Sequence, residues 1–294
     1  MTQSPFRSRP MALLFLSPLI LLTALFFYWP VAEAIRWSFF LEQPFGGEST
    51  FVGFANFRRV LSDPEFWKSL KLTGIFMVTA SVPAVLVPLM LAMAADRGLR
   101  TSRIARNVLV WPKGVAGASI GVIFGFIFNP FVGILTPLNQ LWPGIWSPGT
   151  DGVDAFITLI VANLWNGIPF NFVILLAGLQ ALPDTYAKAA ALDGAGPWRQ
   201  ALDIRLPLLA PQLFFVLVLE FTESIINAFG LIDTMTRGGP GGATTLLVYK
   251  IYADGFKGYD LSGASTQTVL LMIFVLLIAA AQFLLMERRV KYER

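Results

Sequence analysis

Long uncharged stretches constrain this chain more than any other feature of its sequence. No residue between Arg9 and Glu33, or between Lys71 and Asp96, carries a charge, and further segments are nearly as apolar. A helix needs about 20 apolar residues to cross the ~30 Å hydrocarbon core of a bilayer. The sequence therefore predicts an all-α, polytopic membrane protein with one transmembrane domain over residues 1–294. We expect six transmembrane helices, at residues 11–31, 72–95, 106–128, 155–180, 208–230 and 268–286.

The overall composition supports the same class of protein and excludes several others. Hydrophobic residues make up 55% of the chain and charged residues only 14%, whereas soluble domains carry about 25% charged residues. The chain has no cysteine and no histidine, which removes disulfides, thiolate metal sites and histidine bases. Its basic residues form no patch interleaved with aromatic residues, so nucleic-acid binding is not expected. We expect no catalytic residue and no metal site.

The distribution of lysine and arginine indicates the orientation of the chain in the membrane. Cytoplasmic segments of membrane proteins carry the excess of these residues. On one side lie two in the N-terminal segment, four after the second span, three in the loop after the fourth span and four in the C-terminal tail. On the other side, the loops after the first, third and fifth spans contain four, none and three lysines and arginines, respectively. This bias predicts that both termini are cytoplasmic.

One predicted cytoplasmic loop, residues 181–207, is long and patterned. Asp184 is expected to cap a short helix, and the alanine-rich residues that follow are strong helix formers. Gly194 can adopt a left-handed conformation that ends the helix, and Pro197 cannot continue it. A second short helix over residues 198–204 then leads to the fifth span. The loop is therefore expected to be a rigid projection that a soluble partner could grip.

The sequence of this loop resembles a known motif. Residues 186–196 (YAKAAALDGAG) with 204–207 (IRLP) resemble the EAA loop in permease subunits of binding-protein-dependent ABC importers. Residues 237–240 (RGGP), 243–245 (ATT) and 249–252 (YKIY) are typical of the sugar-importer branch. The resemblance extends to FNP at 128–130 and WNGIPFN at 165–171. Residues 44–46 and 249–258 make the chain most similar to permeases of glycerol-3-phosphate importers.

This resemblance implies a fold, a location and partners. It implies the type I ABC importer permease fold in the bacterial inner membrane. The implied partners are a second homologous permease, two ATP-binding-cassette ATPases and an extracytoplasmic solute-binding protein, besides the membrane lipid. The chain lacks the Gly-x-x-x-x-Gly-Lys-[Ser/Thr] phosphate-binding motif, so ATP and Mg²⁺ are expected on the ATPase and no cofactor on this chain. The residues implied to couple to the ATPase are Lys188, Ala189, Ala190, Asp193, Gly194 and Ala195; Lys188 stands where the family has a glutamate.

Polar residues inside the spans are the candidates for contact with a solute. A charge in the hydrocarbon region costs roughly 3 kcal/mol or more and usually faces a cavity or a partner. Carboxylates and amides can bond the hydroxyls of a sugar or polyol. Helical spacing and the resemblance together indicate a solute-binding set, namely Lys113, Asn163, Asn166, Gly167, Phe170, Glu220, Glu223, Ser224 and Asn227. The alternative is that these residues join helices, with Lys113 paired to Glu220 or Glu223.

The sequence thus predicts a permease that imports a sugar or glycerol-type solute by an ATP-driven mechanism. A lysine in the path favours an anionic group such as phosphate, whereas two glutamates disfavour one. A secondary transporter working without an ATPase is the alternative, but it would need an inverted repeat or a pair of broken helices, which the sequence does not display. An intramembrane enzyme is a third possibility, and the residues for its chemistry are lacking.

Overall fold

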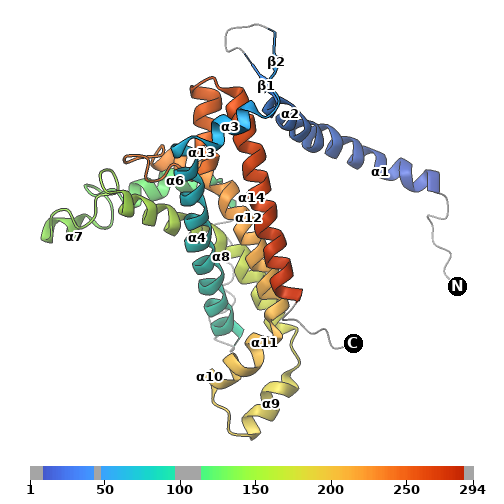
Figure 1. The fold of residues 1–294 in the computed structure, drawn as a ribbon. Helices are drawn as coiled ribbons and strands as arrows, with labels where there is room; N and C mark the ends of the chain where they lie inside the picture. Colours follow the sequence, from blue (N-terminus) through green and yellow to red (C-terminus); the bar gives the residue numbers. More distant parts are fainter. Residues whose placement is uncertain (1–8, 43–47, 97–113, 288–294) are drawn as a thin grey trace. The chain divides into compact units, whose positions relative to one another are not determined.

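The computed structural model describes residues 9–42, 48–96 and 114–287, which group into two compact units (Figure 1). One unit is drawn from residues 1–66 and 251–272, and the other from residues 67–250 and 273–294. Within the described ranges, five helical segments are long and apolar enough to cross a membrane, and a sixth apolar helix is shorter. The prediction of an all-α membrane protein is confirmed.

The long helices extend beyond the predicted spans. The first span is a continuous helical run formed by α1 (Arg9–Thr23), the π-helical turn η1 (Ala24–Tyr28) and α2 (Trp29–Ser38). The other long helices are α4 (Pro64–Asp96), α8 (Gly152–Gln180), α12 (Ala210–Met235) and α14 (Leu261–Glu287). The prediction marked the lipid-length apolar part of each helix. Polar residues such as Lys68 and Lys71 are good helix formers, so α4 continues through them.

The third predicted span is only partly described. The helix α6 (Gly117–Ile127) covers its second half, and 11 residues correspond to about 16 Å, too short to cross a bilayer. The predicted start of this span, with Lys113, lies outside the described residues.

Short elements connect the long helices. They are β1 (Phe40–Leu41), β2 (Thr50–Phe51), α3 (Ala55–Leu61), α7 (Thr136–Leu141), α9 (Asp184–Leu192), α10 (Pro197–Gln200), η3 (Ala201–Arg205), α11 (Leu206–Leu208), α13 (Leu247–Tyr252) and η4 (Ala253–Lys257). The two strands pair antiparallel, with Phe40 opposite Phe51.

The first unit is held together around Asn56. Its side-chain amide is buried and donates to the carbonyl oxygens of Ser38 (3.1 Å) and Phe40 (2.9 Å), which fixes α3 against the end of α2. Arg59 pairs with Asp260 at 3.0 Å. These contacts tie the segment after the first span to the start of α14.

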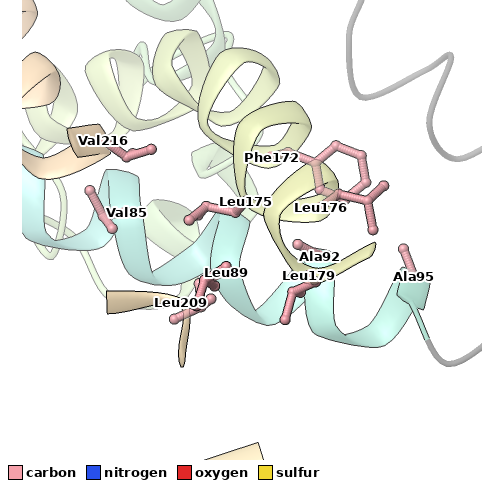
Figure 2. Packing of buried hydrophobic residues seen from close by; sticks show 10 residues of the cluster. All are labelled: Val85, Leu89, Ala92, Ala95, Phe172, Leu175, Leu176, Leu179, Leu209 and Val216. Atoms are coloured by element: carbon pink, nitrogen blue, oxygen red, sulfur yellow. The ribbon is translucent and has the colours of Figure 1, made fainter. Parts of the chain in front are cut away.

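The core of the second unit lies between α4, α8 and α12. Buried residues recur at helical spacing on α4 (Val85, Leu89, Ala92 and Ala95) and meet a matching row on α8 (Figure 2). In an apolar stretch of 18 residues, 50% of α4 and 56% of α8 is buried, whereas 0% of the corresponding stretch of the first span is buried. Lipid tails are as apolar as these side chains, so close packing and interhelical hydrogen bonds must supply much of the association energy. One group of interhelical hydrogen bonds in this core surrounds Glu220.

Candidate functional site

The loop after α8 folds as two short helices joined by a tight turn. The helix α9 begins at Asp184, so Pro183 rather than Asp184 occupies the N-cap position, which corrects one detail of the prediction. At its end, Gly194 has φ +78°. The Gly194 amide donates to the Ala191 carbonyl (3.1 Å) and the Ala195 amide to the Ala190 carbonyl (2.9 Å). This pair of bonds is the Schellman motif, and it confirms the predicted left-handed helix end.

The second half of the loop is fixed by side chains as well. Pro197 occupies the first turn of α10, and the Gln200 side-chain amide donates to the Ala195 carbonyl at 2.8 Å. Arg205, in the π-helical turn η3, pairs with Asp96 at the end of α4 at 2.5 Å. The two side chains of this pair are only 28% and 16% exposed. The loop is therefore tied to the end of a long helix of the same unit.

Large apolar side chains lie on the outside of this loop. Leu192 is 90% exposed and Trp198 is 75% exposed, while Tyr186 and Leu202 are each more than half exposed. Among the residues predicted for coupling, Lys188, Ala189, Asp193 and Gly194 are exposed, Ala195 is partly exposed and Ala190 is buried. We call the four exposed apolar residues Tyr186, Leu192, Trp198 and Leu202 the coupling face. Such a surface on a projecting loop is typical of a protein-binding site.

A buried carboxylate joins three helices in the middle of the second unit. Glu220 on α12 is 4% exposed and accepts a hydrogen bond from the Asn171 side-chain amide of α8 at 2.8 Å. The same amide nitrogen also donates to the Ala84 carbonyl of α4 at 2.7 Å. Asn171 therefore uses both of its N–H groups to link α12 and α4.

Two serines continue this polar contact by one turn. The Ser81 hydroxyl on α4 lies 3.2 Å from the Ser224 hydroxyl of α12 and 3.3 Å from the Glu220 carbonyl. Both serines are fully buried. We call the set of Ser81, Asn171, Glu220 and Ser224 the polar junction.

Gly167 allows the polar junction to be this compact. A Cβ atom at this position would lie 3.0 Å and 3.2 Å from the two carboxylate oxygens of Glu220 and 3.4 Å from the Cβ of Ala84. These distances are tighter than ordinary contacts, so only glycine leaves the carboxylate its present place. Gly167 thus serves helix packing beside Glu220.

The remaining residues predicted for solute binding are placed as follows. Asn163 and Asn166 are buried on α8, and Phe170 is partly buried one turn further along. The side-chain nitrogen of Asn163 has no hydrogen-bond partner among the described residues. Glu223 and Asn227 are partly buried on α12, and Lys113 lies outside the described residues. The structure brings Gly167, Glu220 and Ser224 together.

Sequence reasoning missed three residues of these sites. Asn171 and Ser81 complete the polar junction, and Asp96 anchors the loop through Arg205. A signal for Asn171 was present, because it lies four residues after Gly167 and therefore on the same face of α8. No local pattern links Asp96 to a residue more than a hundred positions away.

The family profile described as "Binding-protein-dependent transport system inner membrane component" matches residues 61–292. The chain therefore belongs to this family of importer permeases, and the predicted identification is confirmed. Among its relatives is the "sn-glycerol-3-phosphate transport system permease protein UgpA" of Brucella abortus biovar 1, which is 42% identical over 99% of this chain and 100% of that protein. The protein of the same name from Rhizobium meliloti is 42% identical over 98% of each chain.

Solved structures support the same fold. A chain of a bacterial ABC transporter involved in the import of the acidic polysaccharide alginate has a TM-score of 0.82 at 19% identity, with 96% of each chain covered. A chain of the MetNI methionine ABC transporter, in an inward-facing form, has a TM-score of 0.56 at 18% identity and covers 78% of this chain and 100% of that one. The importer permease fold and the location in the inner membrane follow from these findings.

Proposed function

We propose that this chain is one of two permease subunits in an ATP-driven importer for sn-glycerol-3-phosphate or a closely related glycerol-type solute. The solute is proposed from the named relatives, which share 42% identity over almost the whole chain. The observation that carries the importer mechanism is the rigid loop after α8, with its Schellman turn and exposed coupling face.

The proposed assembly contains a second permease, two ATPases and an extracytoplasmic binding protein. The coupling face would dock into a groove of one ATPase, with Leu192 and Trp198 as apolar anchors. ATP and Mg²⁺ would be held by the ATPases, while this chain performs no chemistry and carries no cofactor or metal. The proposed orientation places both termini and this loop in the cytoplasm, because the loops on that side carry most of the arginines and lysines.

The proposed solute path runs along the partly buried flank of α12 and α8, past Glu223, Asn227 and Phe170. Lys113, Asn163 and Asn166 complete the proposed set. The proposed set also includes three residues that lie beside the path, namely Gly167, Glu220 and Ser224. Glu220 and Ser224 belong to the polar junction and Gly167 packs against Glu220, so these contacts favour a role in holding the helices together.

Co-purification tests the coupling face. Trp198→Asp should reduce recovery of the ATPase with a tagged permease, because a charge would enter the apolar contact. Phe256→Asp is the matched control, since Phe256 is 69% exposed and lies outside the loop. Equal ATPase recovery with both variants would overturn the docking proposal.

Uptake experiments test the solute and the energy source. Cells that carry the complete importer should take up radiolabelled sn-glycerol-3-phosphate, and an ATPase variant without hydrolytic activity should abolish this uptake. Uptake that persists with the inactive ATPase would favour the secondary transporter. Failure with sn-glycerol-3-phosphate but success with another solute bound by the cognate binding protein would correct the solute alone.

A further inference from the structure

The loop between α6 and α8 differs in charge from the other loops on its side of the membrane. Every residue from Gly114 to Thr150 is uncharged. The segment between the first two spans contains Glu42, Arg58 and Arg59, and the segment before the last span contains Arg237 and Lys257. Loops that face water or a soluble partner ordinarily keep such charges. The absence of charge therefore indicates that this loop contacts something apolar.

Most of the exposed apolar side chains of this loop lie away from its cavity. A cavity of about 430 Å³ is lined by polar residues of the loop, among them Asn139, Ser147 and Thr150, and also by Phe131 and two prolines. The exposed apolar residues Val132, Ile134, Leu141, Trp142 and Ile145 do not line this cavity; Leu141 is 72% exposed and Ile134 is 68% exposed. We call these five residues the apolar rim. The loop thus carries an exposed apolar surface outside its cavity, although it is mostly irregular.

Internal hydrogen bonds satisfy backbone groups of this loop. The Asn139 side chain donates to the Trp146 carbonyl (2.8 Å) and accepts from the Trp146 amide (3.0 Å). The Trp146 ring nitrogen donates to the Phe128 carbonyl at 3.0 Å, and the Asn129 side chain accepts from the Phe131 amide at 2.9 Å. Irregular backbone is tolerated near lipid only where its polar groups find such partners.

The length of α8 indicates that this loop lies near the edge of the bilayer. It precedes α8, at the end opposite the coupling loop (Figure 1). A helix of 29 residues is about 43 Å long, which exceeds the ~30 Å hydrocarbon core and reaches the headgroup region. Tryptophans are enriched at this level, because their rings combine an apolar face with a polar N–H.

We propose that the apolar rim of the loop at residues 129–150 inserts into the membrane interface, in the leaflet opposite the coupling loop. The occupant of this surface is lipid rather than the binding protein or the second permease. The surface would anchor the loop beside α8, as interfacial apolar residues do in other membrane-bound elements.

Spin labelling tests this proposal, and the cysteine-free sequence suits it. Leu141→Cys and Ile134→Cys are labelled with a nitroxide in the complete complex, reconstituted in nanodiscs of phosphatidylethanolamine and phosphatidylglycerol. Thr150→Cys is the control for the cavity side of the loop, and Leu21→Cys, at a 64% exposed position of the first span, is the control for lipid. Only complexes that elute as the native assembly and hydrolyse ATP are measured.

The readout is the collision rate of each label with oxygen and with a water-soluble nickel chelate. Oxygen concentrates in the bilayer, so its collision rate should exceed that of nickel severalfold at positions 141 and 134, as at position 21. At position 150 the collision rate with the nickel chelate should exceed that with oxygen. A nickel rate at 141 and 134 like that at 150 would place the rim in water and overturn the proposal. Low rates with both reagents would show that protein covers the rim, and would overturn it as well.

Discussion

Replacement of Gly194 is expected to weaken ATPase docking through backbone strain alone. Gly194 has φ +78°, and a Cβ atom at this position would meet nothing within 4 Å. Gly194→Val therefore introduces no clash, but a β-branched residue in the left-handed region costs about 1–2 kcal/mol. If the loop escapes this cost by leaving the docking-competent shape, the apparent affinity for the ATPase falls about 5- to 30-fold.

The assay measures ATPase binding by the purified permease pair and uptake by the complete importer. Gly194→Asn should restore most of both, because asparagine tolerates the left-handed conformation. Gly196→Ala is the matched control, since Gly196 also has open space around it but has φ −66°. Wild-type binding and uptake in a correctly inserted Gly194→Val protein would refute the reasoning. Equal losses in the Gly194 and Gly196 variants would refute it too.

Three further substitutions separate packing from transport. Asn171→Leu removes a donor from the buried Glu220, which should destabilise the subunit by about 1–3 kcal/mol and lower its abundance in the membrane; unchanged abundance and thermal stability would contradict the structural role of this bond. Asn227→Leu should reduce uptake without loss of abundance, measured by transport and immunoblotting of the same membranes, whereas reduced abundance with normal uptake per molecule would assign Asn227 to packing. Lys113→Met should impair uptake of an anionic solute far more than that of a neutral analogue if the lysine contacts the solute, and a cycle with Glu220→Gln should show rescue if the lysine only neutralises a carboxylate.

The fold was predictable because hydropathy and turn chemistry act locally. An uncharged stretch such as the one after Arg9 indicates a spanning helix by itself, and the glycine at 194 marks the end of α9. The ends of the spanning helices were less predictable. The helix α4 starts at Pro64, because helix formation continues outside the lipid-length apolar segment on which the prediction relied.

The polar junction was only half predictable for a related reason. Helical spacing indicates that Glu220 and Ser224 share a face of α12, which the structure confirms. The identity of the partner depends on how α4, α8 and α12 cross, and spacing along one helix carries no information on that. The same spacing places Asn227 on this face. Asn227 is nevertheless only partly buried, whereas Glu220 is 4% exposed.

Because α8 is long, a small tilt of this helix would move its two ends by several ångströms. This helix carries the uncharged loop at one end and the coupling loop at the other, with Gly167 and Asn171 near its middle. If α8 tilts as a rigid body about a pivot at Gly167, where it meets Glu220, its two arms are about 22 Å and 20 Å long. A tilt of about 10° about that pivot would displace each end by about 4 Å. Pro169 interrupts the backbone hydrogen bonds close to the pivot, so the two arms can also swing by different amounts.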